Sequence, residues 1–132
     1  MEITLSVCLP VDVRSVPFAR ALCRDAFSHL AVEQSVVEQI TLAVSETCAN
    51  VVRHAGRHEY EVRVEIDDRR CRITVLDHGE GFEPSALQPG SLLDGGLGLA
   101  LVRALVDSLE FGRDDDGRHR VTFEKSLTPV RA

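Results

Sequence analysis

The chain has 132 residues and a formal net charge of -6; 44% of its residues are hydrophobic and 27% are charged. This length fits one core, so we expect residues 1–132 to form a single domain. The negative charge disfavours direct nucleic-acid binding, and no apolar run reaches the roughly 18 residues that a membrane helix needs. The N-terminus lacks the basic segment of a secretory signal, so we expect a cytoplasmic protein.

The first part of the chain predicts a strand followed by two helices. Residues 2–8 alternate apolar and polar side chains, and Pro10 ends this predicted strand. Ser15 is a candidate cap for the first helix. An S-x-x-E capping box at residues 35–38 predicts the start of the second helix, and Gly56 is its expected stop. The apolar stripe of this second helix is Val36, Ile40, Ala43, Val44, Thr47 and Val51.

The second part predicts a hairpin, a long loop, a helix and two strands. Residues 60–66 and 71–76 alternate in hydrophobicity, which predicts a hairpin with one buried face. Residues 82–94 lack periodicity, and a loop of this length in a compact chain is more often functional than idle. This order of elements favours an α+β two-layer sandwich, a mixed but mostly antiparallel sheet covered by helices. The remaining elements are a helix after Gly98 and strands at 109–113 and 119–126.

The four cysteines are scattered and form no C-x-x-C pair. This pattern favours reduced, buried thiols over a zinc site. They are Cys8, Cys23, Cys48 and Cys71.

Glu46, Asn50 and His54 are four residues apart, so they share one face of the second helix. The amide oxygen of Asn50 suits Mg²⁺, and a glutamate one turn earlier can deprotonate a hydroxyl or a water. We expect His54 to pack against or cap the helix end. Taken alone, this row is also typical of a solvated polar helix face.

Asp77 follows a strand that is expected to be buried, where a carboxylate needs a hydrogen-bond donor. The exocyclic amine of adenine is one candidate donor. Gly79 and Gly81 would let a flat base approach the backbone. Because Asp and Gly are common turn residues, a β-turn is the simpler interpretation of this block alone.

Gly95, Gly96 and Gly98 precede an amphipathic helix whose first N–H groups can bind phosphate. Their spacing is neither a Walker A loop nor G-x-G-x-x-G, and a flexible connection is the alternative. The three blocks in this order together predict a magnesium–nucleotide site.

These blocks resemble the N, G1 and G2 boxes of the Bergerat-fold, or GHKL-type, ATPases. The residues that carry the resemblance are Glu46 to Ala55, Asp77 to Phe82 and Gly96 to Leu99. The chain is most similar to the small bacterial anti-sigma factor serine/threonine-protein kinases. The resemblance implies a histidine-kinase-like ATPase fold that holds ATP between the sheet and the helices.

The resemblance also implies a role for each matching residue. Glu46 would be the catalytic base, Asn50 would hold Mg²⁺, and Asp77 would bind the adenine amine. Residues 83–95 would form a lid over ATP. The other implied nucleotide-binding residues are Gly79, Gly81, Phe82, Gly96, Leu97, Gly98 and Leu99.

The implied function is an ATP-dependent transferase that regulates transcription. It would phosphorylate a STAS-type anti-anti-sigma partner and sequester a sigma factor, and a homodimer is among the expected assemblies. Asp94 stands where some of these kinases carry a basic residue, and Arg118 and His119 follow Gly117 where members often carry threonine. These departures favour an alternative, a nucleotide-responsive regulatory module with little or no kinase activity. A third alternative is the detached ATP-binding domain of a histidine kinase. Such a protein needs a pair of dimerisation helices, which the sequence does not predict, so this alternative is disfavoured.

Overall fold

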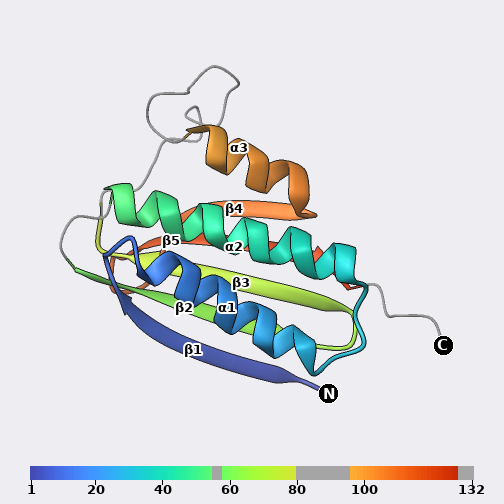
Figure 1. The fold of residues 1–132 in the computed structure, drawn as a ribbon. Coiled ribbons are helices and arrows are strands. Elements are labelled where there is room, and N and C mark those ends of the chain that lie inside the picture. Colours follow the sequence, from blue (N-terminus) through green and yellow to red (C-terminus); the bar gives the residue numbers. More distant parts are fainter. Residues whose placement is uncertain (55–57, 80–95, 128–132) are drawn as a thin grey trace.

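The computed structural model describes residues 1–54, 58–79 and 96–127 of the chain. Within these residues, five strands form one sheet and the helices cover one of its faces (Figure 1). The expected α+β sandwich is confirmed, and the four strand pairings described are all antiparallel. The elements are β1 (Ile3–Pro10), α1 (Ser15–Ser28), α2 (Gln34–His54), β2 (Glu59–Ile66), β3 (Arg70–Asp77), α3 (Gly96–Leu105), β4 (Ser108–Arg113) and β5 (His119–Ser126).

The sheet has the strand order β1-β2-β3-β5-β4, so the last strand in the sequence lies between β3 and β4. Its bounds agree with the predicted strand at 119–126. The antiparallel register places His119, the first residue of β5, opposite Asp77, the last residue of β3. The start of β5 therefore lies beside the end of β3.

Helix α2 is the central element of the core. It lies over the sheet, with α1 and α3 packed against its two sides (Figure 1). Side chains at helical spacing place one long face of α2 in the core, as the apolar stripe predicted. The fully buried members of this face are Ile40, Ala43, Val44, Thr47 and Cys48.

The start of α1 differs from the prediction that Ser15 is its cap. Ser15 is the first helical residue, and Arg14 takes the N-cap position without a side-chain cap. The Ser15 hydroxyl is buried and donates to the carbonyl of Asp12 at 2.7 Å. It also lies 2.6 Å from the hydroxyl of Tyr60. Ser15 therefore ties α1 to β2 instead of capping the helix.

The start of α2 also differs from the predicted capping box. The helix begins at Gln34, which places Ser35 inside the first turn and exposed to solvent. The carbonyl of Glu33 accepts the first helical hydrogen bonds, so the backbone and not Ser35 defines this start. Helix α3 begins at Gly96, three residues earlier than expected from the prediction of a helix after Gly98.

The prediction of buried thiols is correct for three cysteines and wrong for one. Cys23, Cys48 and Cys71 are buried and free, whereas Cys8 is exposed. Cys8 lies at an exposed position of the alternating strand β1, next to the buried Leu9.

Among the helices described, none is both long enough and apolar enough to cross a membrane.

We expect Ile40→Ala to lower the free energy of unfolding by about 2–5 kcal/mol, because it leaves a cavity beneath α2. Ile40 is 0% exposed, whereas Leu42 on the same helix is 40% exposed. Chemical denaturation of Leu42→Ala is the control and should show a change within about 0.5 kcal/mol. Equal losses in the two variants would contradict the packing described.

Candidate nucleotide site

Three chain segments that carry the predicted blocks meet at one end of the molecule. The C-terminal end of α2, the C-terminal end of β3 and the N-terminal end of α3 lie at the same end in Figure 1. These segments contribute Glu46 and Asn50, Asp77, and Gly98. The fold thus gathers the polar residues of distant sequence blocks at one edge of the helix and sheet layers.

Asn50 is the most unusual side chain of this region. It is only 2% exposed, although the sequence placed it beside the apolar stripe of α2. Neither its amide oxygen nor its amide nitrogen has a hydrogen-bond partner among the described residues. A buried amide without a partner costs roughly 1–3 kcal/mol, so such a group is retained where a ligand completes it. An amide oxygen is a suitable Mg²⁺ ligand, and the residue therefore fits the predicted metal position.

Glu46 lies one helical turn before Asn50 and is half-buried. Its Oε2 atom is 2.7 Å from the position that a Cβ atom on Gly98 would occupy. Only a residue without a side chain allows this approach between α2 and the first turn of α3. The first turn of a helix presents free N–H groups and the positive end of the helix dipole. A carboxylate and a potential phosphate cradle are therefore neighbours.

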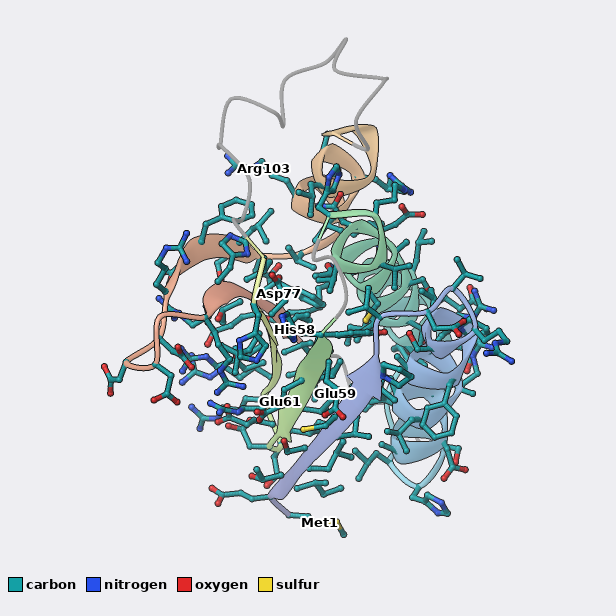
Figure 2. The ribbon with its side chains drawn as sticks, turned by 90° about the vertical axis from the view of Figure 1, so that its left-hand side faces the viewer. Met1, His58, Glu59, Glu61, Asp77 and Arg103 are labelled. Atoms are coloured by element: carbon teal, nitrogen blue, oxygen red, sulfur yellow. The ribbon has the colours of Figure 1, made fainter. Side chains whose placement is uncertain are left out.

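Asp77 ends β3 and is 3% exposed, on the side of the sheet that faces the helices (Figure 2). Its Oδ1 atom accepts a hydrogen bond of 2.7 Å from the backbone N–H of Gly79. This contact is the turn that the Asp-x-Gly spacing indicated. The turn and a binding role are compatible, because each carboxylate oxygen accepts more than one hydrogen bond.

His119 is a neighbour of Asp77 that sequence reasoning did not identify as part of the site. It is 5% exposed, and its Nδ1 atom lies 3.5 Å from Oδ2 of Asp77. Its ring stacks on Phe111 of β4, with 6.4 Å between the ring centroids. The contact depends on the register of β3 with β5, which no local pattern encodes. The available signal was a polar residue at the end of one strand and another at the start of a later strand.

Two histidines lie at the rim of the site. His78 follows Asp77 directly, and its ring meets that of His58 edge-on at a centroid distance of 5.5 Å. Both are exposed, and Figure 2 labels His58. His54 is also exposed and lies in the last turn of α2, where a basic side chain interacts favourably with the helix dipole.

Cys48 lies on α2 between Glu46 and Asn50 but belongs to the core. Burial raises the pKa of its thiol to about 12. The thiol therefore stays protonated at neutral pH and supplies no thiolate nucleophile to the site.

The remaining predicted residues are placed only in part. Gly96 and Leu97 open α3, and Leu99 is buried in the same helix. Gly81, Phe82, the 83–95 lid, Asp94 and Gly95 lie outside the described residues.

In the described ranges, no three His, Cys, Asp or Glu side chains form a group that could hold a metal ion. A Mg²⁺ ion at Asn50 would therefore rely on phosphate and water oxygens for its other ligands.

We expect Asn50→Leu to raise the free energy of unfolding of the nucleotide-free protein by about 1–3 kcal/mol, because it removes a buried amide that has no partner in the described part of the chain. Denaturation by urea would measure the change. Thr47→Val is the matched control on the same helix, because the buried Thr47 hydroxyl already donates to the Ala43 carbonyl at 2.8 Å. A loss of stability in Asn50→Leu, or an equal gain in both variants, would contradict the interpretation of Asn50.

The approach of Glu46 to Gly98 predicts a coupling between these two residues. In the Glu46→Ala background, Gly98→Ala should stabilise the protein by up to about 1 kcal/mol, because alanine favours a helix. With Glu46 present, the new methyl group displaces the carboxylate and this gain should be smaller. A double-mutant cycle of unfolding free energies would measure a coupling of about 0.5 kcal/mol or more. Additive effects would show that the two residues do not interact.

Comparison with known proteins identifies the family of the chain. A family model described as a histidine kinase-like ATPase domain matches residues 9–125. Serine-protein kinase RsbW of Staphylococcus epidermidis is 32% identical over 117 residues, which cover 76% of this chain and 74% of the relative. The same kinase of Bacillus licheniformis is 34% identical over 115 residues, which cover 76% of this chain and 72% of the relative.

Two solved structures share the fold. The crystal structure of the RsbU and RsbW domains of Rv1364c from Mycobacterium tuberculosis has a TM-score of 0.74 at 21% identity. The match covers 98% of this chain and 34% of that chain. The histidine kinase domain from Erythrobacter litoralis EL346 has a TM-score of 0.56 at 20% identity, with 89% and 61% covered. The family match begins in β1 and ends in β5, so it includes Glu46, Asn50, Asp77 and Gly98, and the chain belongs to the histidine kinase-like ATPase domain family.

Proposed function

We propose that this chain is an ATP-binding anti-sigma factor serine/threonine kinase. It phosphorylates a STAS-type anti-anti-sigma protein and sequesters a sigma factor. The identity of 32% to a serine-protein kinase supports this proposal. The single observation that carries it is the buried amide of Asn50, which has no hydrogen-bond partner among the described residues and lies one helical turn from Glu46. The chain belongs to a family of ATPase domains, and the magnesium ion that accompanies the phosphates of ATP is a suitable ligand for such an amide.

The proposal assigns three kinds of contact to the nucleotide. Asp77 accepts a hydrogen bond from the adenine amine, and Asn50 holds Mg²⁺, which neutralises charge on the phosphates when bound. The free N–H groups of the first turn of α3 bind phosphate oxygens. The remaining contacts come from Gly79, Gly81, Phe82, Gly96, Leu97, Gly98 and Leu99.

Glu46 acts as the general base of the transfer. Its carboxylate takes the proton of the partner's serine or threonine hydroxyl as that oxygen attacks the γ-phosphorus. A new oxygen–phosphorus bond forms, the bond from the γ-phosphorus to the bridging β–γ oxygen breaks, and ADP leaves. The proximity of Glu46 to Gly98 supports this role, because it sets the base beside the first turn of α3.

In this proposal, residues 1–132 act as one cytoplasmic ATP-binding domain without a direct contact to nucleic acid or membrane. Its partners are proteins, and a homodimer is one of its assemblies. The acidic net charge of -6 supports the absence of a nucleic-acid surface.

Titration calorimetry of Mg-ATP tests the nucleotide site first. The wild-type protein should bind saturably, and Asp77→Asn should weaken binding at least about tenfold, because an acceptor for the adenine amine is lost. Asp115→Asn, which changes an exposed carboxylate in the β4–β5 turn, is the matched control and should bind as the wild type does. Absence of binding by the wild type at a sensitivity of roughly 1 mM would overturn the proposal.

Transfer of labelled γ-phosphate to a STAS-domain protein tests the second step. Glu46→Gln should bind Mg-ATP normally and transfer phosphate at least about a hundredfold more slowly, because the base is removed. Binding of ATP without transfer by the wild type would identify the protein as a nucleotide-responsive module. The observation that favours this second function is that Arg118 and His119 follow Gly117, where family members often carry a threonine directly after the glycine.

A further inference from the structure

We propose that His119 is a positioning residue of the adenine subsite, which orients the carboxylate of Asp77 through its Nδ1 atom. The inference rests on the proposed nucleotide site and deepens it. It assigns a role to a histidine two residues after Gly117, in the segment where the family resemblance implies a threonine directly after the glycine.

Two contacts restrict the carboxylate of Asp77, one at each of its oxygens. The backbone N–H of Gly79 holds Oδ1 at 2.7 Å, and His119 Nδ1 faces Oδ2 at 3.5 Å. Both side chains are more than nine-tenths buried. The 3.5 Å separation is an ion-pair distance, and the two atoms do not form a hydrogen bond with each other in this structure. Such contacts at functional sites commonly shorten when the ligand binds.

The proposed role requires a proton on the Nδ1 atom of His119. An unprotonated Nδ1 would direct its lone pair at a carboxylate, which is repulsive, whereas an N–H at the same place donates to Oδ2. Both the imidazolium and one neutral tautomer satisfy this condition. In the proposed complex, the Nδ1–H of His119 donates to Oδ2 of Asp77 once this contact has shortened, and Oδ2 keeps a lone pair for the adenine amine.

The fold fixes the ring of His119 in place. The stack on Phe111 has an interplanar angle of 23°, and the β3–β5 register places the ring opposite Asp77. A donor held in this way limits the rotation of the carboxylate. The Gly79 hydrogen bond and the fixed ring of His119 therefore restrict the carboxylate before the nucleotide arrives, which reduces the entropy that binding must remove.

Three substitutions of His119 separate a donor role from a space-filling role. His119→Leu removes the donor and keeps a bulky side chain. His119→Asn places an amide nitrogen at the same number of bonds from Cα as Nδ1, whereas His119→Gln places it one bond further away. Calorimetry would measure the Kd of each variant for Mg-ATP and for the magnesium complex of purine riboside triphosphate, which lacks the 6-amino group.

We expect His119→Leu to bind ATP about tenfold more weakly, and His119→Asn to recover most of the loss while His119→Gln does not. With the analogue that lacks the amine, the three variants should lie within about twofold of the wild type. Thr122→Val, a buried residue of the same strand on the opposite face of the sheet, is the control and should bind both nucleotides as the wild type does.

A pattern that follows side-chain volume, with His119→Gln binding better than His119→Asn, would overturn the inference. Equal losses for both nucleotides would overturn it as well, because the effect would not pass through the adenine amine. Wild-type binding of ATP with no change in His119→Leu would overturn the inference alone. Absence of binding by the wild type would overturn the proposed function and the inference together.

Discussion

The structure depends on two roles of helix α2, which forms the centre of the hydrophobic core and also carries residues of the candidate site. One face of this helix supplies the centre of the core, with Ile40, Val44 and Cys48 fully excluded from solvent. The same helical period carries Asn50 into the buried layer, where its amide meets no partner among the described residues. The apolar contacts of the preceding turns offset the cost of this amide, which is of the order of 1–3 kcal/mol. The site is therefore held by the same packing that stabilises the fold.

Charge at the site is unevenly distributed. Glu46 and Asp77 bring two carboxylates to the region where the proposed function places a polyphosphate, in a protein of net charge -6. Repulsion between phosphate and carboxylate must be offset by donors, and the free N–H groups of α3 are suited to that role. A divalent cation would supply the rest. Binding of ATP by this chain should accordingly depend on magnesium more steeply than binding of a neutral nucleoside.

The sequence predicted the fold class and the element order because alternation and helical spacing are local signals. It did not predict the role of Ser15, whose hydroxyl donates to the Asp12 carbonyl and lies within hydrogen-bond distance of the Tyr60 hydroxyl. It placed Asn50 at the edge of the buried face, because periodicity cannot tell a half-exposed position from a covered one when α3 packs against that edge. The contact of His119 with Asp77 required the strand order, which no local pattern gives. The assignments of Glu46 and Asp77 to nucleotide chemistry remain predictions.

The insertion of β5 between β3 and β4 has a consequence for the order of folding. During synthesis on the ribosome, α2 and β3 are made before β5. One edge of β3 and one edge of β4 therefore stay unpaired until β5 has been synthesised. Pairing across such a distance in the sequence is slow, because the loop must close before the contacts form. Nucleotide would then bind only to chains that have completed the sheet. Because the nucleotide would bind only to fully folded molecules, it would shift the folding equilibrium toward them.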